Sequence, residues 1–275
     1  MAFAGLLADW LSSPAARLTE LACWFLAAYL LGAIPFGLLL GWCIAGVDIR
    51  QHGSGNIGAT NLARVIGWRY FPLALLLDFA KGAIPVSAWL WRTGHWQAVF
   101  RSTAVASPGL LEPLSLHELD CAALIGLAAL SGHLWPIYLR FRGGKGVATG
   151  AGVVSVLMPM PTLLAALVWV IVAWMTRYVS LSSLTAAGIL VIGQFLHTWP
   201  DCFAPPHRAA SCLALLGAGI VFVRHRENIV RLWQGRESKI GQQVSATPAA
   251  EMHADGVPGE PDQPEHTPTT GETPP

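Results

Sequence analysis

The feature that most constrains this chain is a series of apolar runs, several of which approach the length needed to cross a lipid bilayer. A helix needs ~20 predominantly apolar residues to cross the hydrocarbon core. Charged residues make up only 12% of the chain and hydrophobic residues 53%, whereas soluble domains carry about 25% charged residues. This deficit excludes an ordinary cytosolic enzyme. We expect an all-α fold, a polytopic bundle of helices in a membrane.

The runs predict seven transmembrane helices, with the longest run divided in two. Residues 147–175 are too long for one ordinary span, and Pro159 and Pro161 lie within them. Proline lacks a backbone N–H and clashes with the preceding turn, so we expect a break there. The expected spans are 21–46, 70–91, 119–139, 144–158, 162–176, 183–199 and 209–224.

Basic residues predict the orientation, because lysine and arginine gather on the cytoplasmic side of a membrane. With seven helices, four basic segments fall on one side, near residues 50–69, 140–145, 177 and 224–239. A single span over 147–175 would place the second and last of these segments on opposite sides. The N-terminus is therefore expected outside and the C-terminus in the cytoplasm.

Three regions are expected along the chain. Residues 1–20 read as a peripheral N-terminal segment, and residues 21–240 form the membrane domain. Residues 241–275 are rich in Pro, Gly, Thr and Glu with few aromatic residues. Such a tail cannot bury enough apolar surface to fold, so we expect it to be disordered.

A Gly-rich stretch directly after the first apolar run carries the strongest sign of chemistry. Between His52 and Asn61, glycines allow the backbone to approach a ligand closely, and short side chains supply hydroxyl and amide donors. The residues concerned are Gly53, Gly55, Gly58, Ser54, Asn56, Thr60 and Asn61, with Arg64 following. These donors suit a phosphate oxygen more than an apolar ligand.

A second Gly-rich element runs from Gly143 to Gly146 and contains Lys145. It is not a nucleotide P-loop, because Leu139 and Gly146 stand where that motif has Gly and Ser or Thr. Arg64 and Lys145 are the best candidate phosphate ligands, since arginine offers a bidentate fork and lysine a point charge. The alternative is that both are cytoplasmic anchors that meet lipid headgroups.

Asp78 and Lys81 lie three residues apart within the second span. Charged side chains inside a bilayer usually face the protein interior and pair with each other. A structural ion pair is therefore expected, and the alternative is that Lys81 faces an anionic substrate.

His225, Glu227 and Asn228 begin the segment after the last span. In a helix His225 and Asn228 share a face and Glu227 points away. A histidine is a natural general base, and Asn228 could orient a nucleophile or hold a developing oxyanion. The alternative is a solvated helix at the membrane surface. A Gly-x-Ser-x-Gly elbow is absent, and no motif argues for an acyl-enzyme, a metal or a cofactor.

Four motifs in this order resemble those of the bacterial acyl-phosphate glycerol-3-phosphate acyltransferases, the PlsY type. They are residues 48–61, 143–149, 176–183 and 224–229, and residues 77–82 also resemble a family segment. The resemblance covers about residues 30–240. It implies a seven-helix bacterial plasma-membrane enzyme that moves a fatty acyl group from acyl phosphate to glycerol 3-phosphate, giving lysophosphatidic acid. Its active site would face the cytoplasm.

The resemblance points to His225 and Asn228 as catalytic residues, and to Ser54, Arg64, Lys145 and Ser183 as substrate ligands. The neighbouring Gly55, Asn56, Asn61, Gly144 and Gly146 complete the expected substrate-binding set. Acyl phosphate is already activated, so we expect the glycerol hydroxyl to attack it directly. The proton goes to His225 or to a substrate phosphate, and the sequence leaves both routes open.

Expected partners are the two substrates, membrane lipids and a soluble enzyme that produces acyl phosphate, with no nucleic acid. The rival function is transport of a phosphorylated or anionic solute, because broken helices with Gly-rich ends also build transporter sites. Against transport, no repeat relates the two halves of the chain, and the polar motifs gather on one face.

Overall fold

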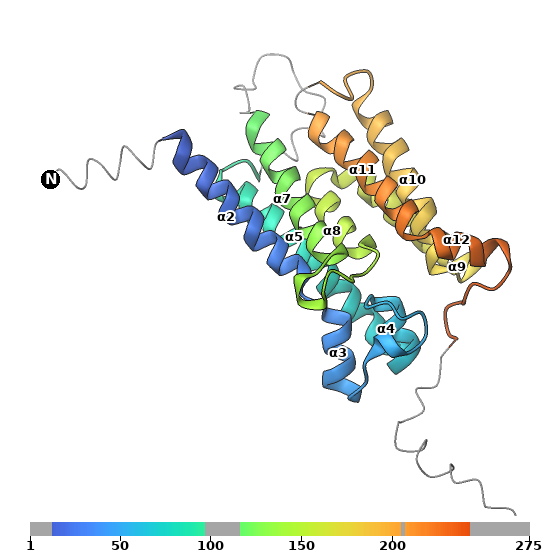
Figure 1. The fold of residues 1–275 in the computed structure, drawn as a ribbon. Coiled ribbons are helices and arrows are strands. Elements are labelled where there is room, and N and C mark those ends of the chain that lie inside the picture. Colours follow the sequence, from blue (N-terminus) through green and yellow to red (C-terminus); the bar gives the residue numbers. More distant parts are fainter. Residues whose placement is uncertain (1–12, 97–115, 205–206, 243–275) are drawn as a thin grey trace, which may run out of the picture. The chain divides into compact units, whose positions relative to one another are not determined.

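The computed structural model describes residues 13–96, 116–204 and 207–242, and every regular element within them is a helix (Figure 1). The α-helices are α2 (Pro14–Ala33), α3 (Phe36–Ala45), α4 (Ala59–Ile66), α5 (Phe71–Arg92), α7 (Leu116–Leu134), α8 (Val147–Leu157), α9 (Pro159–Thr176), α10 (Val179–Thr198), α11 (Arg208–Arg224) and α12 (Arg226–Trp233). Short 3₁₀ helices are η1 (Ile49–Gln51), η2 (Trp68–Tyr70) and η3 (Ile137–Leu139). The all-α prediction is confirmed for this part of the chain.

Some expectations fall on residues that the structure does not describe. Residues 1–12 of the expected peripheral segment, most of the long connection at 92–118, and residues 243–275 of the expected disordered tail lie outside the described ranges. The boundaries of the three expected regions stay predictions.

Five helical segments of the described chain are long and apolar enough to cross a membrane, and α11 with α12 makes a sixth if this pair, bent by 57°, is one span. Of the seven predicted spans, the one that is too short to cross a membrane is α8. Its 11 residues extend about 16 Å at 1.5 Å per residue, whereas the hydrocarbon core is ~30 Å thick. Seven spans therefore stay a prediction.

The first span differs from its expected bounds. Helix α2 begins at Pro14, because the Ser13 Oγ accepts a hydrogen bond from the Ala16 N–H at 3.2 Å and caps it. The helix ends before Pro35, and α3 continues after the break. At the break the Ile34 carbonyl accepts from the Phe36 N–H at 3.1 Å and from the Lys81 Nζ at 2.9 Å.

The predicted break near the two prolines is confirmed, but it lies at Met158, earlier than expected. Helix α8 ends at Leu157 and α9 begins directly with Pro159. Pro159 and Pro161 both lie in the first turn of α9, where backbone N–H groups have no partner within the helix and proline costs little.

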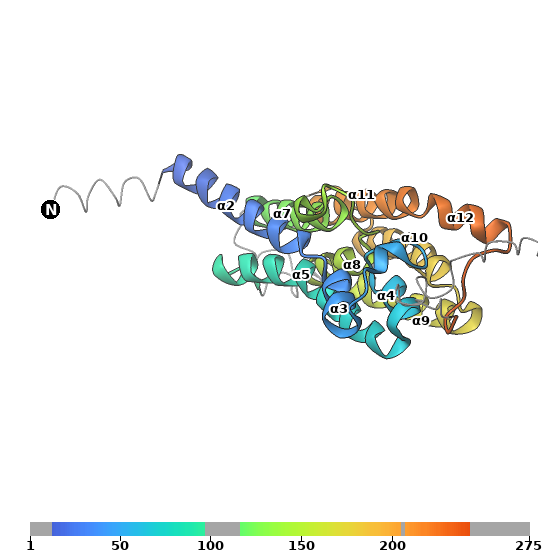
Figure 2. The ribbon, with the colours of Figure 1, turned by 60° about the horizontal axis from the view of Figure 1, so that its bottom comes forward.

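Glycines bring the helices of one half of the bundle into backbone contact. Helix α2 packs along α7, and α5 packs along α8 (Figures 1 and 2). A Cβ added at Gly32 or Gly132 would overlap the α7 or α2 backbone, and one at Gly82 or Gly152 would overlap the α8 or α5 backbone. Such close approach is typical of helices that associate in membranes. It fixes the scaffold on which the Gly-rich loops are mounted.

Candidate active site

The first Gly-rich loop folds around one side chain, Asn61. Its Nδ2 donates to the carbonyls of Ile49, His52 and Asn56, at 2.7, 3.1 and 2.9 Å. Its Oδ1 accepts from the backbone N–H and the hydroxyl of Ser54, at 2.8 and 3.1 Å. These contacts use the hydrogen-bonding capacity of an amide. In this structure the Asn61 side chain holds the loop, and its expected role in substrate binding stays a prediction.

Two glycines make that loop possible. Gly53 and Gly55 have φ of 60° and 66°, in the left-handed region that glycine adopts without a steric penalty. A Cβ at Gly53 would also overlap the Asn61 Oδ1. The turn presents Ser54 and Asn56 to the pocket described below, whereas Gly55 is not among the residues that line it.

Arg64 follows on α4, an amphipathic helix whose inner face is buried. Its side chain lies against the C-terminal segment, with Nη2 donating to the Ser238 carbonyl at 3.3 Å. Its Nε is buried and has no hydrogen-bond partner among the described residues. Burial lowers the pKa of Arg64, and the charge of Glu237 opposes that effect. A buried cation with an unused donor favours an anionic ligand.

The second Gly-rich loop precedes α8 and carries Lys145. The Arg224 guanidinium donates to the carbonyls of Gly143 and Gly144, with the shortest contact 2.7 Å long, and so ties this loop to α11. A Cβ at Gly144 would overlap the His133 ring. Gly144 is therefore needed for close packing, and unlike Gly146 it is not part of the pocket wall.

The Lys145 side chain lines the pocket, and its Nζ donates to the Oδ1 of Asn228 on α12. Burial lowers the pKa of Lys145 to about 8, and the negative charge of Glu237 opposes the fall. The ammonium group remains mostly protonated at neutral pH. Its contact in this structure is to a neutral amide, so its charge is available to an anion.

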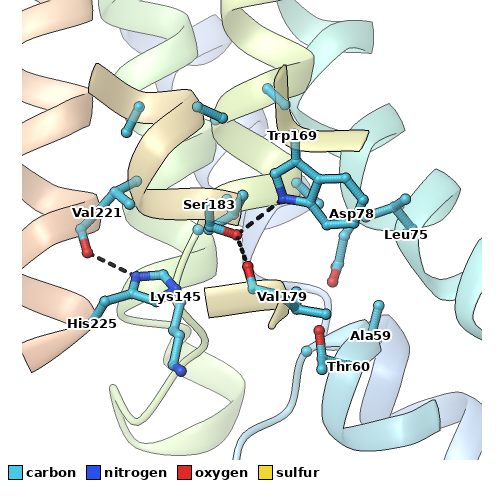
Figure 3. Close-up of a pocket in the computed structure, with 18 of the residues that line it drawn as sticks. Ala59, Thr60, Leu75, Asp78, Lys145, Trp169, Val179, Ser183, Val221 and His225 are labelled. Atoms are coloured by element: carbon cyan, nitrogen blue, oxygen red, sulfur yellow. Dashed lines mark hydrogen bonds between the residues drawn. The ribbon is translucent and has the colours of Figure 1, made fainter. Parts of the chain in front are cut away.

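His225 sits at the bend between α11 and α12 and is buried. Its Nδ1 lies 2.8 Å from the Val221 carbonyl (Figure 3). A carbonyl can only accept, so Nδ1 carries the hydrogen and the neutral ring has a bare Nε2. This tautomer is the one required of a base that works through Nε2.

Asn228 lies between a donor and an acceptor. Its Oδ1 accepts from Lys145, and its Nδ2 donates to the Glu237 Oε1 at 2.6 Å. An ammonium can only donate and a carboxylate can only accept, so the chemistry of the two partners fixes the orientation of the amide. The oxygen of Asn228 faces the pocket cation, which suits an orienting role better than an oxyanion role.

The serine hydroxyl groups of residues 180–183 donate to acceptors other than His225. Ser182 and Ser183 donate to the backbone carbonyls of Tyr178 and Val179 at 2.9 and 2.8 Å. The Ser183 oxygen also accepts from the Trp169 indole N–H at 3.2 Å (Figure 3). Ser180 donates to Glu237 at 2.8 Å. None of these contacts joins a serine to His225.

These elements enclose a pocket of about 470 Å³ with a polar and an apolar part. The polar wall includes Ser54, Asn56, Asn61, Arg64, Lys145, Ser180, Ser183, His225, Asn228 and Glu237. The apolar wall comes from α8 to α11 and includes Ala151, Val154, Ala165, Ala166, Trp169, Val170, Ala187, Leu190, Leu213, Gly217 and Ile220. In Figure 3, His225 and Lys145 lie next to each other, and Ser183 lies between them and Trp169.

Nine of the eleven predicted site residues line this pocket, and Gly55 and Gly144 do not. Sequence reasoning missed Glu237, Ser180 and Trp169, which also line it. The available signal for Glu237 was weak, a lone acidic residue between Arg236 and Lys239 in a basic segment.

The expected ion pair within the membrane segment is present. The Lys81 Nζ lies 2.8 Å from the Asp78 carboxylate, and both side chains are buried. Lys81 is not among the residues that line the pocket, whereas Asp78 is. The alternative in which Lys81 faces a substrate therefore has no support in this geometry.

Known proteins match this chain over the region that contains these motifs. A family model described as glycerol-3-phosphate acyltransferase matches residues 22–235. The glycerol-3-phosphate acyltransferase of Anaeromyxobacter sp. (strain Fw109-5) is 41% identical over 215 residues, which cover 78% of this chain and 93% of that protein. The enzyme of the same description from Staphylococcus haemolyticus (strain JCSC1435) is 41% identical over 213 residues, with coverage of 78% and 94%.

A solved structure is similar over the same region. It is a crystal structure of PlsY, an integral membrane glycerol 3-phosphate acyltransferase, in its glycerol 3-phosphate form. The two chains share 35% sequence identity with a TM-score of 0.65, and the match covers 81% of this chain and 96% of the other. The lysophosphatidic acid form matches with a TM-score of 0.64.

Proposed function

This chain belongs to the glycerol-3-phosphate acyltransferase family, and on that premise we propose that it transfers a fatty acyl group from acyl phosphate to glycerol 3-phosphate. The products are lysophosphatidic acid and phosphate. The observation that carries the proposal is the two-part pocket, which joins the cations Arg64 and Lys145 to an apolar wall from α8–α11. A solute transporter needs no such apolar extension, so the transport alternative is not favoured.

In the proposed complex, the phosphates of both substrates lie against Arg64, Lys145 and the first Gly-rich loop. The acyl chain extends along the apolar wall beside Trp169 and Leu213. This placement uses charge-assisted bonds for the phosphates and burial of methylene groups for the chain. The hydroxyl and the acyl carbon are thereby held together, which is the main requirement for an activated donor.

The bond changes are those of a single displacement. A glycerol hydroxyl oxygen bonds to the acyl carbon, the bond from that carbon to the phosphate oxygen breaks, and phosphate leaves. The hydroxyl proton passes to the His225 Nε2 or to a phosphate oxygen of a substrate. Asn228 orients the reacting hydroxyl through its Oδ1, which already faces a donor in this structure.

The choice of donor is tested with purified protein in detergent or vesicles. We expect labelled glycerol 3-phosphate to be converted to lysophosphatidic acid with palmitoyl phosphate, and to remain unconverted with palmitoyl-CoA at the same concentration. A protein in which Arg64 and Lys145 are both alanine serves as the inactive control. Turnover with the thioester alone would overturn the proposed donor while leaving the family unaffected.

Direct attack predicts a ternary complex. The Ser180 hydroxyl does contact a carboxylate, but hydrogen bonds from Arg231, Asn228 and Ser180 outweigh burial and hold the pKa of Glu237 below its ordinary value, so it is a weak base. Initial rates varied in both substrates should give intersecting double-reciprocal lines. Labelled acyl phosphate alone should leave no label on denatured protein. Parallel lines with a stable serine ester would falsify direct transfer.

We propose that the protein lies in the bacterial plasma membrane with this pocket facing the cytoplasm, because the basic segments gather at its polar end. The prediction is tested with single cysteines in a Cys-free background. Arg177→Cys should react with a membrane-impermeant maleimide only after cells are permeabilised. Asp201→Cys, at the other end of α10, should react in intact cells. Labelling of position 177 from outside would reverse the topology.

A further inference from the structure

The carboxylate of Glu237 lines the polar part of the pocket, next to Ser180 and Asn228. It is 7% exposed. Its Oε1 accepts from Ser180 at 2.8 Å and from Asn228 at 2.6 Å, and its Oε2 accepts from the Arg231 Nε at 2.8 Å. Three donors on two helices thus converge on one side chain that belongs to neither helix.

The segment that carries Glu237 is fastened on both sides. Ser238 accepts from Arg64 on α4. Ile240 pairs with Arg177 through two hydrogen bonds, its N–H donating at 2.7 Å and its carbonyl accepting at 2.6 Å. The Lys239 ammonium also lies over the Tyr178 ring, 5.4 Å from its centre. These contacts hold the backbone of residues 238–240, and with it the position of the Glu237 carboxylate.

We propose that Glu237 is a positioning residue for acyl transfer, which fixes the Asn228 amide with its oxygen toward the reacting hydroxyl and keeps Lys145 aligned with the substrate phosphate. The inference rests on the proposed function. Its physical basis is the relay from Glu237 through the Asn228 amide to the Lys145 ammonium. If the carboxylate is lost, Asn228 can turn its amide over, and its donor then meets the donor of Lys145.

The same carboxylate balances the charge of the pocket. The charged and titratable groups that act on Lys145 are Glu237 and Glu227, which raise its pKa, and Arg231 and Arg64, which lower it. His225 is also close enough for the Lys145 charge to act on it. Among the charges that oppose the fall in the Lys145 pKa, that of Glu237 has the largest effect. Removing it leaves a cluster dominated by cations, and the pKa of Lys145 moves further down.

The test compares Glu237→Gln and Glu237→Asp with the wild type and with Glu227→Gln. Glu227 is an exposed acid on α12, one residue from Asn228, so its variant removes the same charge from the same region without touching the relay. Each protein is checked for thermal unfolding and monodisperse elution. Rates with acyl phosphate and glycerol 3-phosphate are then measured from pH 6 to pH 9.

We expect Glu237→Gln to lower kcat by about 10- to 100-fold at neutral pH, as the loss of hydrogen bonds to a charged group does. We also expect the fall of kcat/KM on the basic side to begin at lower pH, because Lys145 loses its proton sooner. Glu237→Asp keeps the charge and withdraws the carboxylate, so kcat falls while the basic side of the profile stays at its wild-type position. Glu227→Gln keeps wild-type kcat.

Two results would overturn the inference. One is wild-type kcat, KM and pH profile in folded Glu237→Gln. The other is a lower yield or unfolding temperature with unchanged kinetics, which would make Glu237 a structural residue only. An inactive wild type would instead count against the proposed function, so the two failures are distinguishable.

Discussion

Replacing His225 by alanine should lower kcat by about 100-fold or more, the usual contribution of general acid–base catalysis, with KM for either substrate changed only a few-fold. The Nδ1–H of His225 is engaged by the Val221 carbonyl, so the basic nitrogen of the neutral ring is Nε2. Losing that nitrogen removes the protein's own acceptor for the hydroxyl proton. The measurement is steady-state kinetics on purified, correctly folded protein.

Two variants sharpen this experiment. His225→Asn offers an amide N–H that can still bond to Val221 but has no basic nitrogen, so it should be as slow as the alanine variant. His197→Ala changes an exposed histidine at the far end of α10 and should leave kcat unchanged. A loss of less than about tenfold in both His225 variants would assign the proton to a substrate phosphate.

Replacing Lys145 by alanine should reduce kcat/KM for a phosphate-bearing substrate by roughly 10- to 150-fold, corresponding to about 1.5–3 kcal/mol for a charge-assisted hydrogen bond. Folding should suffer less, because Lys145 bonds to a neutral amide in this structure and not to a buried acid. Kinetics in both substrates and thermal unfolding together measure the two effects.

The pH profile gives Lys145 a second signature. Its pKa of about 8 lies below that of an ordinary lysine, so wild-type kcat/KM should fall as pH rises above about 8 and the ammonium loses its proton. Lys145→Ala should lack that descent. The matched control is Arg142→Ala, an exposed cation on the same loop, which should keep both the rate and the profile. Unchanged kinetics in Lys145→Ala would remove this residue from the site.

The fold was largely predictable because a membrane helix can be identified from the apolar composition of a single stretch of sequence. The span expected at 209–224 is α11, Arg208–Arg224, and the span expected at 70–91 is α5, Phe71–Arg92. The start of α2 at Pro14 was missed because it depends on a cap and not on apolarity. The number of spans stays open because α8 is short. A hydropathy pattern does not say whether such a helix is buried among its neighbours or crosses the bilayer.

The site was predictable where a motif is local and less so where contacts are distant in the sequence. The composition of the two Gly-rich loops was enough to identify Ser54 and Lys145 as candidate site residues. The task of Asn61 was not foreseeable, because the three carbonyls that it bonds are brought together only by the folded turn. Glu237 reaches Ser180 across 57 positions, and no periodicity in the sequence reports such a contact.

The pocket has a polar wall and an apolar wall from α8–α11. This division determines which concentration of each substrate controls the rate. The proposed acyl donor partitions into lipid, and the glycerol phosphate stays dissolved in water. The donor's effective concentration is then its mole fraction in the surface around the protein, whereas that of the acceptor is its molarity in bulk solution. Diluting the donor with inert lipid at constant total amount should slow the reaction, although nothing in the aqueous phase has changed.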